Sequence, residues 1–188
     1  EIKKDDYNFI LVNFANGDVI GHTADFNAKV SCVKEIDKRL KDVVEEALLK
    51  QYTVLVTADH GVLEVGYKRG KPNVSHTTNL VPFILISPML KSIHLKKGKL
   101  ANIAPTVLDI MGIKKPEFYE ESLFDALPVF KSRKVLLIIL DGWGLGEENE
   151  NNPIFVAAPT FYNSLLQEYS WTFLEASGES VGLKLSQA

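Results

Sequence analysis

Short runs of apolar residues alternate along the chain with longer stretches in which apolar residues recur every three or four positions. Four of the short runs contain no polar residue and have the length of a strand: Phe9–Val12, Val54–Val56, Phe83–Ile86 and Val135–Leu140. Continuous rather than alternating hydrophobicity predicts strands that are covered on both faces, as in a parallel sheet. The longest run, Val135–Leu140, is far too short to span a membrane.

Helical periodicity fills the stretches between these strands. Apolar residues from Val30 to Ala47 recur at helical spacing, and Asp25 precedes them as an expected N-cap. A second helix is expected around Ile103–Met111, with Gly112 as its stop, and a third over Phe161–Glu168. Strands that alternate with helices predict an α/β fold, here a three-layer sandwich with a mainly parallel sheet.

An aspartate follows three of the predicted strands: Asp18, Asp59 and Asp141. In open α/β sheets, ligands bind at the carboxyl ends of the strands. If these strands are parallel, the three carboxylates meet at one edge, where they repel and raise one another's pKa. A bound cation relieves that repulsion. Each aspartate taken alone is as well explained as a helix or turn cap.

Three of the four histidines accompany these strand ends: His22, His60 and His76. Mixed Asp and His ligands favour Mn or Zn over Ca, which prefers oxygen ligands alone. Six ligands are too many for one catalytic ion with an open position, but they suit two ions that act on a phosphoryl group. His94 lies between Ile93 and Leu95 without an acidic neighbour, and we interpret it as a surface residue.

Composition narrows the class of protein without deciding its function. The 188 residues carry a net charge of −3, which gives no electrostatic reason to expect nucleic acid or an anionic membrane as a partner. Cys32 is the single cysteine, so no internal disulfide is expected, in keeping with a reducing cytoplasm. The first residues contain no apolar signal core. We therefore expect a cytoplasmic location.

Longer motifs resemble the phosphatase-like domain of cofactor-independent phosphoglycerate mutase, in the alkaline phosphatase superfamily. They cover nearly the whole chain: Val12–Thr23, Val56–Gly61, His76–Phe83, Leu100–Leu108, Leu137–Gly144 and Leu174–Leu183. The Asp-His-Gly element at 59–61 is common to the wider superfamily, whereas the long strand-plus-loop matches are more specific to the mutase. One local departure is Val62–Leu63, where the family usually has Asn-Ala.

The resemblance implies a ligand set, metals and a reaction. Asp18, His22 and His76 would hold one metal, and Asp59, His60 and Asp141 the other. The family's metals are usually Mn, with Mg, Zn or Co as alternatives. Its enzymes interconvert 3-phosphoglycerate and 2-phosphoglycerate through a phosphoserine, so phosphoglycerate is the expected partner of the parent enzyme.

The order of the segments differs from that of the family and resembles a circular permutation. Within a single domain over residues 1–188, segment 1–123 resembles the family's C-terminal part and segment 134–188 its N-terminal part. Residues 124–133 would connect them. A permutation is physically tolerable because domain termini often lie close together at the surface.

The family's nucleophile is not found in this chain, so no catalytic residue is assigned. The serine is expected just beyond Ala188, and Ser186 does not match its motif. The substrate-binding domain is missing too, which leaves substrate-binding residues unassigned and suggests the missing domain or another chain as a partner. We expect metal binding with little or no turnover by this chain alone. Two alternatives stay open: another metal-dependent phosphatase or phosphodiesterase, and a non-catalytic metal-binding scaffold.

Overall fold

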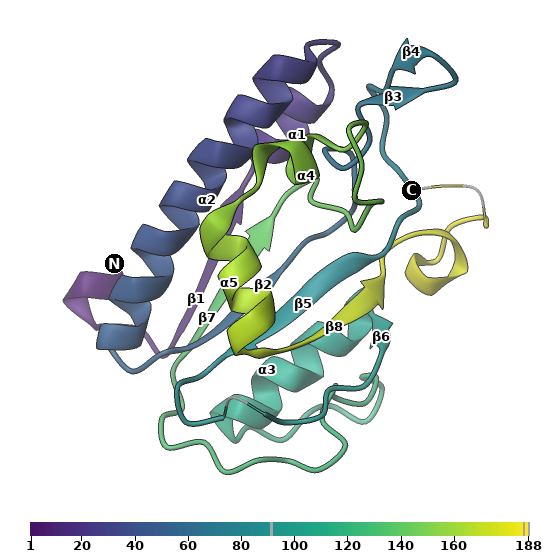
Figure 1. Ribbon diagram of the computed structural model, residues 1–188. Helices are drawn as coiled ribbons and strands as arrows, with labels where there is room; N and C mark the ends of the chain where they lie inside the picture. The colour runs from purple at the N-terminus through teal and green to yellow at the C-terminus, as the bar shows by residue number, and fades with distance from the viewer. Residues whose placement is uncertain (91, 186, 188) are drawn as a thin grey trace.

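A mixed sheet is the middle layer of the computed structural model, which describes residues 1–90, 92–185 and 187 (Figure 1). Within these residues the sheet has six strands. Their order across the sheet is β1 (Phe9–Phe14), β7 (Val135–Leu140), β2 (Thr53–Thr57), β5 (Val81–Ile86), β8 (Ser170–Glu175) and β6 (Gly98–Lys99). A separate small hairpin consists of β3 (Tyr67–Lys68) and β4 (Lys71–Pro72).

The sheet is mainly parallel, as the sequence predicts, with one reversed strand. β7 pairs in parallel with both β1 and β2, and β6 pairs in parallel with β8. β5 is antiparallel to both of its neighbours, β2 and β8. For Phe83–Ile86 the expected parallel direction is therefore wrong. All of β5 is buried, because helices cover both faces of the sheet, and burial on two faces does not depend on strand direction.

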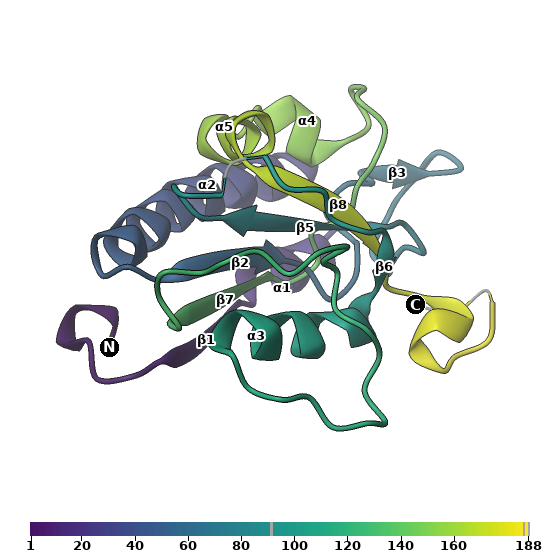
Figure 2. The ribbon, with the colours of Figure 1, turned by 90° about the horizontal axis from the view of Figure 1, so that it is seen from below.

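Helices form the two outer layers (Figure 2). α2 (Phe26–Leu49), α4 (Pro153–Ala157) and α5 (Thr160–Glu168) lie over one face, and α3 (Ile103–Met111) lies over the other. The three-layer α/β sandwich is therefore confirmed. The remaining helices are short: α1 (Asn16–Gly21), η1 (Ile2–Lys4), η2 (Leu100–Asn102) and η3 (Gly178–Val181).

The expected ends of the two main helices are confirmed. The Asp25 carboxylate accepts a hydrogen bond from the Ala28 amide at 3.0 Å and so caps α2. Gly112 ends α3 with a left-handed φ of 68°, a conformation that costs glycine little. The sequence pattern did not predict α1 or α4, because each is too short to repeat an apolar spacing.

The strand β1 is less buried than its apolar sequence predicts. Its residues alternate between exposed and half-buried, and Phe9 and Leu11 are 41% and 51% exposed. β1 lies at the edge of the described sheet, whereas β2, β5 and β7 form the centre of the core. A run of apolar residues shows that a strand can be covered, but it does not tell where the sheet ends.

A buried carboxylate joins two helices of the same layer. Asp37 of α2 is 8% exposed and accepts hydrogen bonds from the backbone amides of Phe161 and Tyr162, at 3.1 and 2.7 Å. These amides belong to the first turn of α5, whose own N-cap, Pro159, makes no side-chain cap. Asp37 therefore satisfies backbone donors that α5 cannot satisfy itself.

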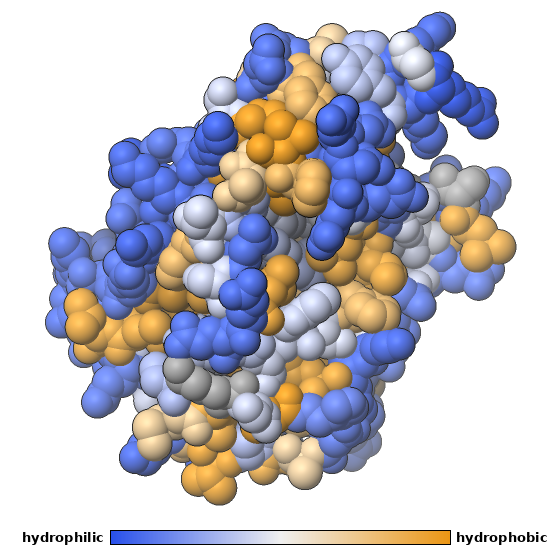
Figure 3. All heavy atoms as spheres, in the orientation of Figure 1, coloured by the Kyte–Doolittle hydropathy of each residue, from blue (hydrophilic) through white to orange (hydrophobic). Residues whose placement is uncertain are grey.

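Between α3 and β7 the chain follows an irregular path. In the stretch 113–134, all of which is described, no helix or strand forms apart from a bridge between Phe124 and Leu95. On the face of the molecule in Figure 3, hydrophilic side chains predominate over α2 and apolar ones gather in separate patches. None of the helices in the described residues is both long and apolar enough to cross a membrane.

Candidate metal centre

Three neighbouring parallel strands bring the three aspartates to one edge of the sheet. Asp59 and Asp141 follow β2 and β7, and Asp18 lies in the first turn of α1, just after β1. The Nε2 atom of His60 is a common reference point, 3.7 Å from Asp18 Oδ1, 3.6 Å from Asp59 Oδ2 and 3.5 Å from Asp141 Oδ1. The expected convergence of the three carboxylates is therefore confirmed.

The reversed direction of β5 brings His76 to the same edge. An antiparallel strand begins where its parallel neighbours end, so the residues just before Val81 lie beside the ends of β2 and β7. The Thr77 amide donates to the Gly61 carbonyl oxygen at 2.9 Å and fixes this approach. As a result, the rings of His60 and His76 stack with their centroids 3.7 Å apart.

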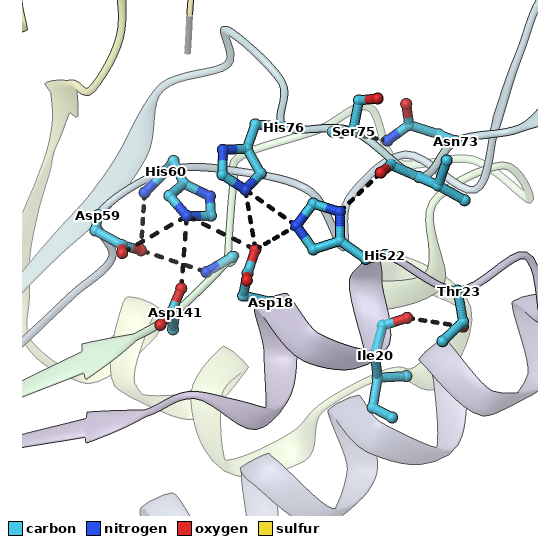
Figure 4. A network of polar contacts seen from close by, with 12 residues as sticks. Asp18, Ile20, His22, Thr23, Asp59, His60, Asn73, Ser75, His76 and Asp141 are labelled. Atoms are coloured by element: carbon cyan, nitrogen blue, oxygen red, sulfur yellow. Dashed lines mark hydrogen bonds and ion pairs between the residues drawn. The ribbon is translucent and has the colours of Figure 1, made fainter.

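One close triangle of ligand atoms consists of Asp18 Oδ1, His22 Nε2 and His76 Nε2 (Figure 4). Its three sides each measure 3.1 Å. Atoms bound at right angles to one ion, each about 2.1 Å from it, lie about 3.0 Å apart. His22 Nδ1 lies 2.7 Å from the Val74 carbonyl oxygen, to which it donates, so its Nε2 lone pair faces the triangle. The donor set fits one divalent ion.

A second, wider group consists of Asp59, His60 and Asp141, with one ligand atom from each within 4.8 Å of the others. Asp59 Oδ1 accepts from the backbone amides of His60 and Gly142, at 3.0 and 3.4 Å. Asn13 donates from Nδ2 to Asp141 Oδ2 at 2.9 Å. These contacts leave Asp59 Oδ2 and Asp141 Oδ1 facing His60 Nε2.

His60 lies between the two groups. One ligand atom each of His60, Asp18 and His76 also lie within 4.8 Å of one another. The 3.1 Å contacts of His22 nevertheless favour His22 as the third member of the Asp18 group, because His60 Nε2 is 0.6 Å farther from Asp18. The division of the six side chains into two metal sites stays a prediction.

The electrostatics of Asp141 reflect the crowding. Burial raises the pKa of the Asp141 carboxyl above its usual value, and the charges of Asp59 and Asp18 raise it further. The hydrogen bond from Asn13 and the proximity of His60 lower the pKa of Asp141 in part. The ionised Asp141 carboxylate is therefore costly to the metal-free protein, and a bound cation would offset that cost.

The structure adds one contact that sequence reasoning missed. Asn13 belongs to a motif that resembles the mutase, but its partner Asp141 is 128 positions away in the chain. His94 is exposed and paired with Asp125, in agreement with its interpretation as a surface residue. Ser186, which does not match the nucleophile's motif, and Ala188, beyond which the serine is expected, lie outside the described residues.

Replacing Asp59 tests the ligand assignment. In Asp59→Asn, the neutral amide should weaken Mn²⁺ binding at the Asp141 group. Loss of an outer hydrogen-bond partner lowers the metal affinity of a site by roughly 10–100-fold, and loss of a direct ligand should lower it by at least as much. Isothermal titration with Mn²⁺ measures this. Asp42→Asn, an exposed change on α2, is the matched control and should bind as the wild type does. Unchanged stoichiometry and affinity in Asp59→Asn would remove Asp59 from the ligand set.

Replacing Asp141 tests the cost of the crowded charge without metal. A carboxyl whose pKa is raised in the folded state destabilises that state when ionised, and the cost vanishes below its unfolded pKa. Asp141→Asn should therefore melt a few degrees above the wild type at neutral pH in EDTA, and the difference should disappear near pH 3.5 to 4, roughly the unfolded Asp value. A pH-independent difference, or none, would contradict this account.

Comparison with known proteins agrees with this geometry. The chain is 48% identical over 118 residues to a 2,3-bisphosphoglycerate-independent phosphoglycerate mutase of Flavobacterium psychrophilum. Proteins of the same name from Flavobacterium johnsoniae and Clostridium tetani are 43% and 44% identical over 117 and 119 residues. Each alignment covers 62% of this chain but spans only 23% of the length of the relative.

A family model gives the broader match. The model of the Metalloenzyme superfamily matches residues 1–115 and 133–188, which include all six candidate ligands, and leaves out residues 116–132. Because this match takes in most of the chain and the structure holds two groups of suitable ligand atoms at one sheet edge, the chain belongs to the Metalloenzyme superfamily.

Proposed function

We propose that this chain is the phosphatase-like, metal-binding part of a cofactor-independent phosphoglycerate mutase. The observation that carries the proposal is the convergence of three aspartates and three histidines at the carboxyl edge of parallel strands. The relatives are named as phosphoglycerate mutases. The reaction that we propose, the interconversion of 3-phosphoglycerate and 2-phosphoglycerate, is the one that the family resemblance implies. The relatives are much longer than the matched part of this chain, so the activity of a whole enzyme is part of the proposal.

In this proposal two divalent ions occupy the site. Asp18, His22 and His76 would hold one ion, and Asp59, His60 and Asp141 the other. Mixed carboxylate and imidazole ligands suit Mn²⁺, our first choice, with Mg²⁺, Zn²⁺ or Co²⁺ as alternatives. Such a pair supplies Lewis acidity, which neutralises charge on a transferring phosphoryl group and on the oxygens at either end.

The chain's own residues would orient these ligands. The Val74 carbonyl oxygen fixes the ring of His22, and Asn13 holds one oxygen of Asp141 so that the other faces inward. The His60 and Gly142 amides do the same for Asp59. A ligand that is held in place before binding loses less conformational freedom when the ion enters.

The nucleophile and the grip on the substrate would come from sequence outside these residues. We propose a serine just beyond Ala188 in the family's order, and a substrate-binding domain that is supplied in the same polypeptide or by another chain. We also propose a cytoplasmic location, for a glycolytic or gluconeogenic enzyme without a nucleic-acid or membrane partner. The isolated chain would then bind metal and turn over poorly or not at all.

We further propose that the segment order reflects a circular permutation. The irregular stretch 113–134 contains the expected connector, 124–133, and residues 116–132 are those that the family model leaves out. Much of the connector is exposed, with Leu127 and Val129 at 56% and 87%. Phe124 is buried in the core and Phe130 packs against it. The exposed remainder of such a link between two formerly free termini would contribute little to the core.

A second candidate function is a metal-binding scaffold without catalysis. It is favoured by the contacts of the six side chains, which run to one another, to Asn13 and to backbone groups. Another metal-dependent phosphatase or phosphodiesterase is the third candidate. Hydrolysis of a generic phosphate ester by the Mn²⁺-loaded chain would favour this third candidate over the other two.

A coupled assay tests the mutase proposal. We expect two Mn²⁺ per chain by titration. Conversion of 3-phosphoglycerate by the Mn²⁺-loaded chain should be at or below detection, because in this proposal the nucleophile and the substrate domain lie outside residues 1–188. Adding the remainder of a relative, as a separate polypeptide or a fusion, should raise turnover. A folded chain that binds no divalent metal under any condition would overturn the proposal.

Cleavage of the connector tests the permutation. A specific protease site placed between Leu127 and Val129 should be cut without loss of the far-UV circular dichroism signal or of Mn²⁺ binding, since β7 is held between β1 and β2. The same site between Lys38 and Arg39, inside α2, is the control and should unfold the protein when cut. Separation of the two fragments after cleavage of the connector would contradict the proposal.

A further inference from the structure

Behind the candidate metal centre lies a buried carboxylate that is not one of the six ligands. Glu64 follows β2 and is only 2% exposed. Its Oε1 atom accepts hydrogen bonds from the hydroxyl of Thr77 and from Asn79 Nδ2, the latter at 2.9 Å. Both donors belong to the segment that begins with His76 and leads into β5. Glu64 therefore contacts the segment that carries one of the candidate ligands.

The backbone of two further ligand-bearing segments packs directly on the Glu64 carboxylate. A Cβ atom at Gly61, which follows His60, would lie 2.3 Å from Glu64 Oε1. A Cβ atom at Gly144, three residues after Asp141, would lie 2.5 and 2.6 Å from Oε1 and Oε2. Real Cβ atoms do not approach this closely, so a side chain at either position would force the Glu64 carboxylate to shift. One carboxylate thus touches the segments of His60, His76 and Asp141.

Stability alone explains this arrangement poorly. Glu64 Oε2 is buried and has no hydrogen-bond partner within the described residues. A buried carboxylate with an unpartnered oxygen is costly, and an apolar side chain of similar size is often better for folding. Each such group in a native structure calls for an explanation, and a role at a functional site or beside a bound ion is one of them. Asp37, the other buried carboxylate with two donors, differs because its contacts join α2 and α5, away from the ligand-bearing segments.

A buried cation lies in the same region. Lys29 of α2 is 1% exposed and donates from Nζ to the Asn73 carbonyl oxygen at 2.5 Å, one residue before Val74, which orients His22. Burial lowers the pKa of Lys29, and attraction to Glu64 opposes that change. The attraction to Glu64 thus favours the ionised form of Lys29. Glu64 therefore acts electrostatically on Lys29, whose partner Asn73 adjoins the residue that orients His22.

We infer that Glu64 is a positioning residue for the metal centre. It holds the segments of His60, His76 and Asp141 at a fixed separation, and its negative charge favours cations at both ligand groups. Glu64 acts through these segments and does not itself ligate. The inference rests on the proposed two-metal function, and it adds a residue that neither ligand group contains.

Metal titration of two variants tests the inference. Glu64→Gln keeps an acceptor for Thr77 and Asn79 but removes the charge, so its Mn²⁺ affinity should fall by about tenfold. Glu64→Ala removes both the acceptor and the charge. Its Mn²⁺ affinity should therefore fall by an amount near the upper end of the roughly 10–100-fold range that loss of an outer hydrogen-bond partner costs a metal site. Calorimetry with Mn²⁺ alone gives affinity and stoichiometry. The electron paramagnetic resonance spectrum of the bound Mn²⁺ should broaden as the ligand segments lose their fixed separation.

Asp37→Ala is the matched control, since it also removes a buried carboxylate with two donors. It should lower the melting temperature while Mn²⁺ affinity and spectrum stay as in the wild type. If Glu64→Gln and Glu64→Ala behave in the same way as this control, with lower stability and unchanged Mn²⁺ binding, the inference is wrong.

Each remaining outcome is also decisive. If Glu64→Ala does not fold, Glu64→Gln alone decides, because it keeps the shape and the acceptor of the native side chain. If the folded wild type binds no Mn²⁺, the proposed function fails and the inference fails with it. If the wild type binds two Mn²⁺ and both Glu64 variants bind two equally tightly, the inference alone fails.

Discussion

Repulsion among carboxylates at one edge of the sheet is the constraint on which the rest of this structure depends. β1, β7 and β2 lie side by side and run in the same direction, so the aspartates that follow them have little freedom to separate. Burial and mutual repulsion then act on the same groups, as the raised pKa of Asp141 indicates. The histidines and hydrogen-bond donors around them form an environment in which a divalent cation resolves the conflict.

One reversed strand completes the set of ligands. If β5 were parallel to β2, the segment before it would begin at the opposite edge, and His76 would be far from Asp18. The antiparallel pairing instead brings the start of β5 to the ends of β2 and β7. There the Thr77 amide donates a hydrogen bond to the Gly61 carbonyl oxygen. Because the sheet is mixed, residues that follow the parallel strands and residues that precede the antiparallel strand β5 lie at the same edge. The same segment supplies the donors to Glu64.

The polar groups buried near this edge differ from those buried elsewhere. Asp37 accepts hydrogen bonds from two backbone amides that a helix end leaves unpaired, and these bonds offset the cost of burying its carboxylate. Within the described residues, Glu64 keeps an oxygen without a partner, and its carboxylate lies so close to Gly61 and Gly144 that a side chain at either position would displace it. Hydrogen bonds to a helix end explain why Asp37 is buried, whereas the burial of Glu64 costs stability. This difference is the basis for assigning Glu64 to the metal centre.

By itself, the sequence determined the fold class, the main helices and the six side chains that meet at the sheet edge. Each of these is encoded locally, in an apolar run, a helical spacing or a polar residue a few positions before or after a strand. The direction of β5, the open edge at β1 and the contacts of Asn13 and Glu64 were decided only in the tertiary structure. The bond from Asn13 to Asp141 joins residues 128 positions apart, and strand direction leaves no mark in a fully buried run. Such features depend on which segments become neighbours, and that choice is made by packing over the whole chain.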